Sequence, residues 1–258
     1  MTDALIGATG FIGTTILRQR PFDRVFSRAN IDESRGGAFQ LVVCAAAPAQ
    51  KWIANREPDA DLRNIERLVG SLREIRCREF VLVSTVDVFA DPDGVDEESA
   101  VVEEGLHAYG LNRLALEERV RQIFPRALVV RLPGLVGPGL RKNVIYDFLN
   151  GNNLHAIDSR AVFQFYPTVN LWTDIQLALR EGLSLVHLTA EPVSVAEVSL
   201  EGFGRVFGGE TAAKPARYDM RSLHAAVFGG TGRYQYSRRE SLLAIRAYAQ
   251  SEPAAHKP

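Results

Sequence analysis

Short apolar runs alternate with amphipathic segments through the first half of the chain. The apolar runs have the length of buried parallel strands and occupy residues 3–7, 24–27, 41–45, 80–84 and 127–132. The segments between them carry apolar residues at helical spacing, over residues 11–19, 58–76 and 103–124. Because strands and helices alternate, we predict an α/β fold in which a doubly wound parallel sheet carries helices on both faces.

The pattern becomes less regular after residue 140. Short helices are expected near 142–150, 170–181 and 195–207, and short strands near 162–166, 184–188 and 214–218. We therefore expect a core over residues 1–140, a small mixed C-terminal lobe over 141–250 that interleaves with the last core elements, and a frayed tail over 251–258. The acidic segment 91–99 is expected to be a solvated loop.

Composition and charge narrow the function classes. The chain has 258 residues, of which 46% are hydrophobic and 24% charged, and its net charge is −1. This balance gives no overall attraction to nucleic acid or to a membrane surface. No apolar stretch reaches the length of a membrane span, and we expect a cytoplasmic protein. We expect no metal site, because the histidines and the two cysteines lack metal-ligand spacing: His107, His155, His187, His224, Cys44 and Cys77.

A glycine-rich turn follows the first predicted strand. Gly7, Gly10 and Gly13 are spaced Gly-x-x-Gly-x-x-Gly and lead into the first predicted helix. Glycines let a backbone approach a pyrophosphate closely, and the amides and dipole of the following helix favour its negative charge. The turn predicts a nucleotide site, although a glycine-rich turn can also serve another purpose.

A tyrosine and an arginine lie one helical turn apart at Tyr109 and Arg113. A fixed cation favours the phenolate, so we expect a lowered pKa for Tyr109, as suits an acid/base group. Thr85 ends the 80–84 strand, where open α/β sheets bind ligands, and can hydrogen-bond the same substrate oxygen. Each residue also has a simpler interpretation: a tyrosine of an amphipathic helix beside a surface arginine, and a threonine bonded to local backbone.

Taken together and in this order, these motifs resemble those of the extended short-chain dehydrogenase/reductase superfamily, and most of all its NAD-dependent epimerase/dehydratase branch. Further segments that match are Cys44–Ala47, Asp61–Ile65 and Arg131–Pro138. The resemblance covers residues 3–190 and weakens beyond them. It implies a Rossmann-type dinucleotide-binding core, a substrate-binding lobe after residue 140, and a homodimer packed through the 103–124 helix.

The resemblance also implies roles for individual residues. Thr85 would polarise the substrate oxygen, Tyr109 would be the acid/base, and Arg113 would stand where the family has lysine. The cofactor would lie against Gly7, Thr9, Gly10, Phe11, Ile12, Gly13, Ser27, Arg28, Ala45, Ala46, Ala47, Pro133 and Leu135. The substrate would lie against Asp87, Lys142, Asn143, Gln164 and Tyr166. A basic solvated loop is an equally good interpretation of Lys142, and the family usually has arginine at the position of Gln164.

Three departures from the family pattern matter. Arg113 keeps the charge of the lysine but cannot release a proton, so a lysine-mediated proton relay would be lost. Ser27 and Arg28 follow the second strand where an NAD enzyme would have an acid; they suit a 2′-phosphate, so we predict NADP in preference to NAD. Asp32 or Glu33 would reverse that preference if the strand ended later. The connection to the 41–45 strand is short, so a strand and a helix of the family are expected to be missing or reduced there.

Two functions remain open at the level of sequence. The first is an NAD(P)-dependent oxidoreductase or epimerase that acts on a carbohydrate-type substrate, such as a nucleotide sugar, by tyrosine-assisted hydride transfer. The motifs do not distinguish reduction from epimerisation. The second is a non-catalytic dinucleotide-binding sensor or partner-binding protein, which the replacement of lysine by Arg113 would permit.

Overall fold

The computed structural model describes residues 2–254, which form two compact units. Among the described residues, unit 1 comprises 2–90, 98–131 and 171–186, and unit 2 comprises 91–97, 132–170 and 187–254. Residues 1 and 255–258 lie outside the described part, as does that portion of the tail expected over 251–258.

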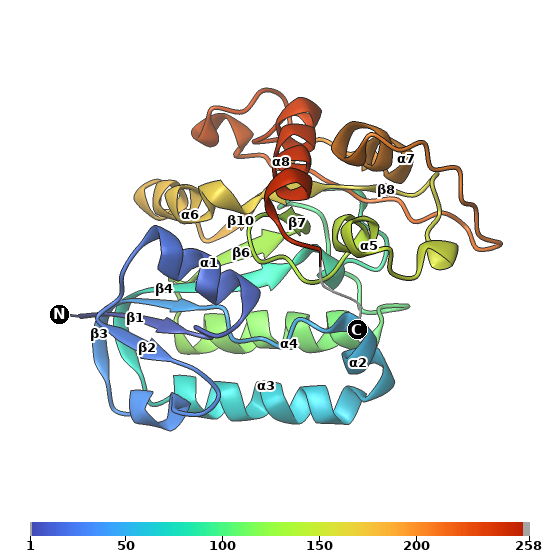
Figure 1. Cartoon of the computed structure of the whole chain (residues 1–258). Helices are drawn as coiled ribbons and strands as arrows, with labels where there is room; N and C mark the ends of the chain where they lie inside the picture. Colours follow the sequence, from blue (N-terminus) through green and yellow to red (C-terminus); the bar gives the residue numbers. More distant parts are fainter. Residues whose placement is uncertain (1, 255–258) are drawn as a thin grey trace. The chain divides into compact units, whose positions relative to one another are not determined.

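A six-stranded sheet in the order β10-β6-β4-β3-β1-β2 forms the centre of unit 1 (Figure 1). The strands are β1 (Thr2–Ile6), β2 (Arg24–Phe26), β3 (Ala38–Cys44), β4 (Arg76–Thr85), β6 (Leu128–Leu132) and β10 (Leu185–His187). β1 pairs in parallel with β2 and β3, and β3 pairs in parallel with β4. The strand order reverses between β1 and β3, which confirms the predicted doubly wound sheet.

Helices cover both faces of this sheet. α1 (Phe11–Gln19) and α6 (Leu171–Arg180) lie on one face, and α3 (Pro58–Leu72) and α4 (Ala108–Ile123) on the other (Figure 1). The short helix α2 (Lys51–Arg56) precedes α3. Apolar faces of α3 and α4 pack on the strands because their buried residues recur at helical spacing: Ile65, Leu68, Val69 and Leu72 on α3, and Leu116 and Val120 on α4.

The start of α4 and the segment between β2 and β3 both bear on the sequence-based expectations. α4 begins at Ala108 rather than at 103, because the His107 side chain accepts a hydrogen bond from the Gly110 N–H (3.0 Å) and so caps the helix there. The segment between β2 and β3 contains a 3₁₀ turn, η1 (Ile31–Ser34), in place of a strand and a helix. The expected reduction at this point is confirmed.

Unit 2 is built from short pieces of mixed structure. Its strands pair in twos: β7 (Gly134–Val136) with β9 (Phe165–Pro167) and β12 (Asp219–Met220) with β5 (Asp93–Val95), both in parallel, and β11 (Val193–Ser194) with β8 (Val162–Phe163), antiparallel. The helices are α5 (Val144–Asn150), α7 (Val195–Glu197), the π-helical turn η5 (Val198–Gly202) and α8 (Arg238–Ser251).

Unit 2 also corrects three expectations. The segment 91–99 is not simply a solvated loop, because β5 pairs with β12 and the Glu97 carboxylate accepts hydrogen bonds from the His187 N–H, the Ser222 hydroxyl and the Leu223 N–H. The strand expected at 214–218 is wrong, since residues 219–220 form the strand instead. Helix α8 was not predicted, although a capping box between Ser237 and Glu240 marks its start.

Within the described residues, no helix combines the length and apolar character that a bilayer crossing requires. The same residues contain no group of three or more metal-ligating side chains.

Candidate active site

The glycine turn lies at the carboxyl end of β1 and packs against the end of β3. Gly7 has φ +95°, and a Cβ there would lie 2.5 Å from the Ala45 carbonyl atoms. A Cβ at Gly13 would lie 2.1 Å from the Gly7 oxygen. The Gly7 and Ala8 amides donate to the Phe26 oxygen at 2.8 and 3.1 Å. The chain itself therefore requires glycine at positions 7 and 13.

Gly10 is different, because nothing in the chain requires its lack of a side chain. A Cβ at Gly10 would come no closer than 3.5 Å to another atom, and its φ of −77° is open to any residue. Gly10 is the N-cap of α1, which has no side-chain cap and no acidic residue in its first turn. An exposed glycine before uncapped helix amides fits a phosphate group that approaches the backbone.

The end of β2 is placed as the sequence predicted. The strand ends at Phe26, Ser27 is half-buried beside Asn30, and Arg28 is exposed with a long contact to the Asn64 oxygen (3.5 Å). Asp32 lies in η1 and pairs with Arg35 at 3.0 Å. The strand therefore does not extend to Asp32, and no acid follows it directly.

Ala45, Ala46 and Ala47 follow β3 beside the glycine turn. The Ala45 amide donates to the Ile6 oxygen (2.8 Å), and Ala46 and Ala47 pack on the unit 1 core. Unit 1 thus places the predicted cofactor residues from the glycine turn, β2 and β3 at the carboxyl ends of neighbouring strands.

Thr85 and Tyr109 meet at the carboxyl end of β4. The Thr85 hydroxyl accepts from the Asp87 N–H (3.2 Å), and its closeness to the Tyr109 phenol lowers the pKa of that phenol. The α4 backbone comes very close to this loop, since a Cβ on Gly110 would lie 2.3 Å from the Asp87 oxygen. The Tyr109 N–H donates to Asn55 on α2 (2.9 Å). The Tyr109 backbone is thus anchored on α2, and its phenol lies near Thr85.

The Tyr109 pKa moves in the direction opposite to the one predicted. Burial raises it, and this effect outweighs the Arg113 cation, which lowers it; the Asp87 carboxylate raises it further. Tyr109 is only 7% exposed, so desolvation of the phenolate dominates. The prediction of a lowered pKa from sequence spacing was wrong because spacing carries no information on burial.

Arg113 is fully buried and is not the surface arginine of the simpler interpretation. Its Nη1 and Nη2 donate to the two carboxylate oxygens of Asp61 on α3 at 3.1 and 3.0 Å, and Nη2 also donates to the Pro48 oxygen. The guanidinium carbon lies 4.5 Å from the centre of the Tyr109 ring. No local pattern indicates Asp61 as a partner of Arg113, because Asp61 comes from a helix far earlier in the chain.

A second buried ion pair supports the end of β4. Arg131 on β6 donates through Nε and Nη2 to Glu117 on α4 at 3.1 and 2.8 Å, and the Ser84 hydroxyl also donates to Glu117. Ser84 is thus engaged in support, while its neighbour Thr85 faces Tyr109. The sequence analysis missed Glu117, whose helical spacing from Tyr109 was its one available signal.

Further charges lie beside Thr85 and Tyr109. Lys51 on α2 pairs with Asp87 (2.8 Å), which lies 3.5 Å from the Thr85 hydroxyl. Burial lowers the pKa of His107, and the Lys51 charge lowers it further. The predicted substrate residue Asp87 is therefore held by a lysine that the sequence analysis had not assigned.

The remaining predicted residues belong to unit 2. Leu135 on β7 lies opposite Tyr166 on β9, and the Asn143 side chain donates to the Leu135 oxygen (2.9 Å) while capping α5. Pro133 is buried, and Lys142 is exposed. Unit 2 thus groups Leu135, Asn143 and Tyr166.

Gln164 has a structural role inside unit 2. Its Nε2 donates to the Thr189 hydroxyl and to the Ala190 and Met220 oxygens at 2.6–2.8 Å, and its Oε1 accepts from the Met220 N–H. The side chain is 1% exposed. These bonds occupy both the nitrogen and the oxygen of the amide. Gln164 is therefore not included among the proposed substrate-binding residues.

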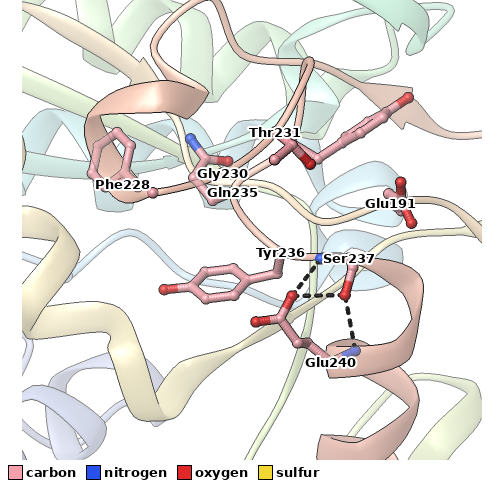
Figure 2. Close-up of a pocket in the computed structure, with 10 residues that line it drawn as sticks. Glu191, Phe228, Gly230, Thr231, Gln235, Tyr236, Ser237 and Glu240 are labelled. Carbon is pink, nitrogen blue, oxygen red and sulfur yellow. Dashed lines mark hydrogen bonds between the residues drawn. The ribbon is translucent and has the colours of Figure 1, made fainter.

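Unit 2 also contains a cavity of about 250 Å³. Figure 2 shows its lining, which comprises Glu191, Phe228, Gly229, Gly230, Thr231, Tyr234, Gln235, Tyr236, Ser237 and Glu240. The Glu240 carboxylate accepts from the Ser237 amide and hydroxyl (Figure 2), and Glu191 accepts from the Arg238 N–H. Its carboxylates cap the α8 N-terminus, and no predicted site residue lines it.

No family model matches the chain, and no curated protein matches it either. Its fold does match solved structures. A dTDP-4-dehydrorhamnose reductase from Clostridium acetobutylicum is 18% identical, with a TM-score of 0.74 over 97% of this chain and 99% of that chain. DesIV, a dTDP-glucose 4,6-dehydratase from Streptomyces venezuelae with NAD bound, is 17% identical, with a TM-score of 0.74 over 97% and 98%.

RMD from Pseudomonas aeruginosa, complexed with NADPH, is 18% identical, with a TM-score of 0.70 over 97% of this chain and 99% of that chain. Each of these structures superposes on 97% of this chain, a range that includes the six-stranded sheet. The chain therefore shares the fold of these reductase and dehydratase structures, as its motifs led us to expect.

Proposed function

We propose that the protein is an NAD(P)-dependent oxidoreductase or epimerase that acts on a carbohydrate-type substrate, such as a nucleotide sugar. The observation that carries this proposal is the hydroxyl pair of Thr85 and Tyr109, which lies in the same unit as the glycine turn and at the carboxyl edge of the same sheet. The similar structures include enzymes solved with NAD, NADPH and UDP-sugars, which supports both ligand classes.

The residues have separate tasks in this proposal. Gly7, Gly10 and Gly13 hold a pyrophosphate, with backbone contacts from Thr9, Phe11 and Ile12, and Ala45–Ala47 flank the adenosine side. A bound nicotinamide supplies or accepts a hydride. Tyr109 exchanges a proton with the substrate oxygen at Oη, and Thr85 hydrogen-bonds the same oxygen. Asp87, held by Lys51, accepts from a sugar hydroxyl.

Tyr109→Phe tests the chemical proposal. We expect kcat to fall by roughly 10²–10⁴-fold, because the proton-transferring group is gone. The dissociation constant for NADPH should stay within about threefold, since the ring is retained. Turnover is measured as NADPH consumption against a panel of UDP- and dTDP-linked keto sugars. Full turnover in Tyr109→Phe would contradict the mechanism.

The cofactor proposal is NADP in preference to NAD. Arg28 offers an exposed guanidinium after β2, and Ser27 a hydroxyl, where an acid would favour NAD. We expect Arg28→Ala to weaken NADPH binding at least about tenfold and to leave NADH binding nearly unchanged. Fluorescence titration of both dinucleotides measures this, and Arg24→Ala, an exposed arginine at the start of β2, is the control. Equal loss for NADPH and NADH would contradict the preference.

The rival function is a non-catalytic dinucleotide sensor. The observation that favours it is the ion pair between Arg113 and Asp61. Because this pair holds the guanidinium, Arg113 is not free to act as the family lysine would. Tight dinucleotide binding without turnover on any keto sugar or sugar alcohol in the panel would support the sensor. The homodimer packed through α4 stays a prediction, which light scattering of the purified protein checks.

A further inference from the structure

Both oxygens of the Asp61 carboxylate accept hydrogen bonds from two adjacent residues of α4, Asn112 and Arg113. Its two oxygens accept from Nη1 and Nη2 of Arg113, and Oδ2 also accepts from the Asn112 side chain (2.9 Å). The Asp61 and Arg113 side chains are 5% and 2% exposed. Asp61 lies in the first turn of α3, where the helix dipole favours a negative charge.

This ion pair fixes the surroundings of Tyr109. The guanidinium is anchored by Asp61 and by the Pro48 oxygen, and its central carbon lies over the Tyr109 ring, 4.5 Å from the ring centre. The Arg113 charge lowers the pKa of the Tyr109 phenol, so the two side chains interact electrostatically. The orientation of Arg113, and through it that of Tyr109, therefore depends on Asp61.

Stability alone gives a weak reason for this arrangement. A buried ion pair is often no better than apolar residues of similar volume, because desolvation offsets the attraction between the charges. The Arg113 Nε is buried without a hydrogen-bond partner, which adds a cost. A pair that costs this much and lies against the proposed acid/base residue points to a role in the site.

We propose that Asp61 is a positioning residue of the active site, which orients Arg113 on Tyr109 and offsets part of its charge, so that the site gives a proton to a carbonyl rather than taking one from an alcohol. This inference rests on the proposed oxidoreductase function and narrows it to reduction. Tyr109 Oη gives its proton to the carbonyl oxygen while the carbon receives a hydride from a reduced nicotinamide, and the phenolate regains a proton from solvent.

The charges that face Tyr109 come in pairs, which favours the protonated phenol. From its own helix it faces Arg113, which Asp61 on α3 neutralises, and His107 lies at the helix start. From the β4 end it faces Asp87, which Lys51 on α2 neutralises. Arg113 lowers the pKa of Tyr109 and Asp87 raises it, and each is held in an ion pair, so the loss of Asp61 would leave the Arg113 charge free to lower that pKa further.

The test is a pH titration of Tyr109 in the protein without cofactor or substrate. Tyrosines labelled with ¹³C at Cζ give one NMR signal each, and Tyr109→Phe identifies the signal of Tyr109 among the 7 tyrosines. In Asp61→Asn the guanidinium charge is uncompensated, so Tyr109 should titrate at lower pH than in the wild type. Asp61→Glu, which keeps a carboxylate, should restore the wild-type titration. An unchanged titration in Asp61→Asn would overturn the proposal.

Glu117→Gln is the matched control. It removes the carboxylate of the second buried pair on the same helix, so it should destabilise the fold comparably and leave the Tyr109 titration unchanged. If Asp61→Asn does not fold, Arg113→Gln is compared with Arg113→Gln/Asp61→Asn, in which the buried cation is absent. Tyr109 should titrate at lower pH in the double variant, and equal titrations would overturn the proposal.

Activity then separates this inference from the proposed function. In Asp61→Asn the alkaline limb of the pH profile for carbonyl reduction should move to lower pH. A Tyr109 titration that moves in a protein that binds no dinucleotide would support the electrostatic role of Asp61 and end the oxidoreductase proposal. If Asp61→Asn leaves the Tyr109 titration unchanged while the wild-type protein reduces keto sugars, the role of Asp61 would be overturned and the oxidoreductase proposal supported.

Discussion

At the scale of single residues, Gly10 separates what the fold needs from what a ligand needs. Glycine is required at positions 7 and 13, because a Cβ there would lie only 2.5 and 2.1 Å from the chain's own backbone, whereas Gly10 has room for a methyl group. The three glycines form one motif in the sequence. In the structure, Gly7 and Gly13 are needed for backbone packing, and Gly10 is not.

Gly10→Ala is therefore expected to spare the fold and impair binding. The free energy of unfolding should fall by less than about 1 kcal/mol, the usual cost of alanine at an N-cap. NADPH affinity should fall by about tenfold or more, because the new methyl group lies where the phosphates approach. Thermal unfolding and fluorescence titration measure the two effects.

Two glycines serve as controls for this substitution. Gly70→Ala, on an exposed position of α3 with no atom near its Cβ, should stabilise the protein by roughly 0.5–1 kcal/mol and leave binding unchanged. Gly13→Ala should destabilise the fold strongly through its clash with the Gly7 oxygen. Unchanged NADPH binding in Gly10→Ala would show that the turn does not hold a pyrophosphate.

The same scale shows where sequence reasoning stops. Tyr109 and Arg113 could be paired from their spacing, because both lie on one helix. Asp61 could not be paired with Arg113, since the two meet only when α3 packs on α4. The burial that reverses the expected pKa change of Tyr109 is also a tertiary effect, and no local pattern contains it.

At the scale of elements, the placement of α4 depends on Gly110. The helix comes so close to the β4 end that a Cβ on Gly110 would lie 2.3 Å from the Asp87 oxygen and 2.6 Å from a Leu106 carbon. Gly110→Ala should push α4 away and separate Tyr109 from Thr85. We expect kcat to fall about tenfold or more with a modest change in NADPH affinity, since a small displacement of catalytic groups is costly.

The elements of unit 1 were predictable for a simple reason. β1, β3, β4 and β6 contain apolar runs of three or four residues, and α3 has a clear buried face, so local pattern and tertiary position agree there. Unit 2 is built from strands of two or three residues, which are too short for a periodic pattern. Its β5–β12 pairing joins residues more than 120 positions apart, so the local sequence of the acidic segment 91–99 predicts only a loop.

Helix α8 was missed despite a local signal. Ser237 accepts from the Glu240 N–H, and the Glu240 carboxylate accepts from the Ser237 N–H and hydroxyl, which is a full capping box. Ser237→Ala should therefore lower the free energy of unfolding by about 1 kcal/mol. Urea unfolding followed by far-UV circular dichroism measures this, and Ser251→Ala at the other end of α8 is the control. Equal stability of the two variants would contradict the capping role.

At the scale of the whole molecule, both units should lose stability on the same alkaline side of neutrality. Burial raises the pKa of Cys44 to about 11 in unit 1, and burial and the neighbouring Asp219 raise that of Tyr234 to about 12 in unit 2. Each group binds its proton more tightly in the folded state. Its contribution is therefore complete below the unfolded pKa and is lost as pH rises through the folded pKa.

On the acid side the sign is opposite. Hydrogen bonds from Arg160 and Thr211 lower the pKa of Asp158, so its contribution is present above its unfolded pKa and is lost as pH falls. Stability should therefore be highest between these limits and fall towards both ends. An unfolding free energy that keeps rising from pH 5 to pH 11 would contradict this balance.

The alkaline loss can be assigned to a unit, because both tryptophans, Trp52 and Trp172, belong to unit 1. The Cys44 change of about two pKa units corresponds to roughly 2–3 kcal/mol of unfolding free energy lost between pH 8 and pH 12. Urea unfolding followed by tryptophan fluorescence should show this loss in the wild type and a smaller pH dependence in Cys44→Ala. Because the comparison is of slopes with pH, the packing cost of the smaller side chain cancels. The same slope in both proteins would mean that Cys44 titrates alike in the folded and unfolded states, and that the carboxyl end of β3 is open to water.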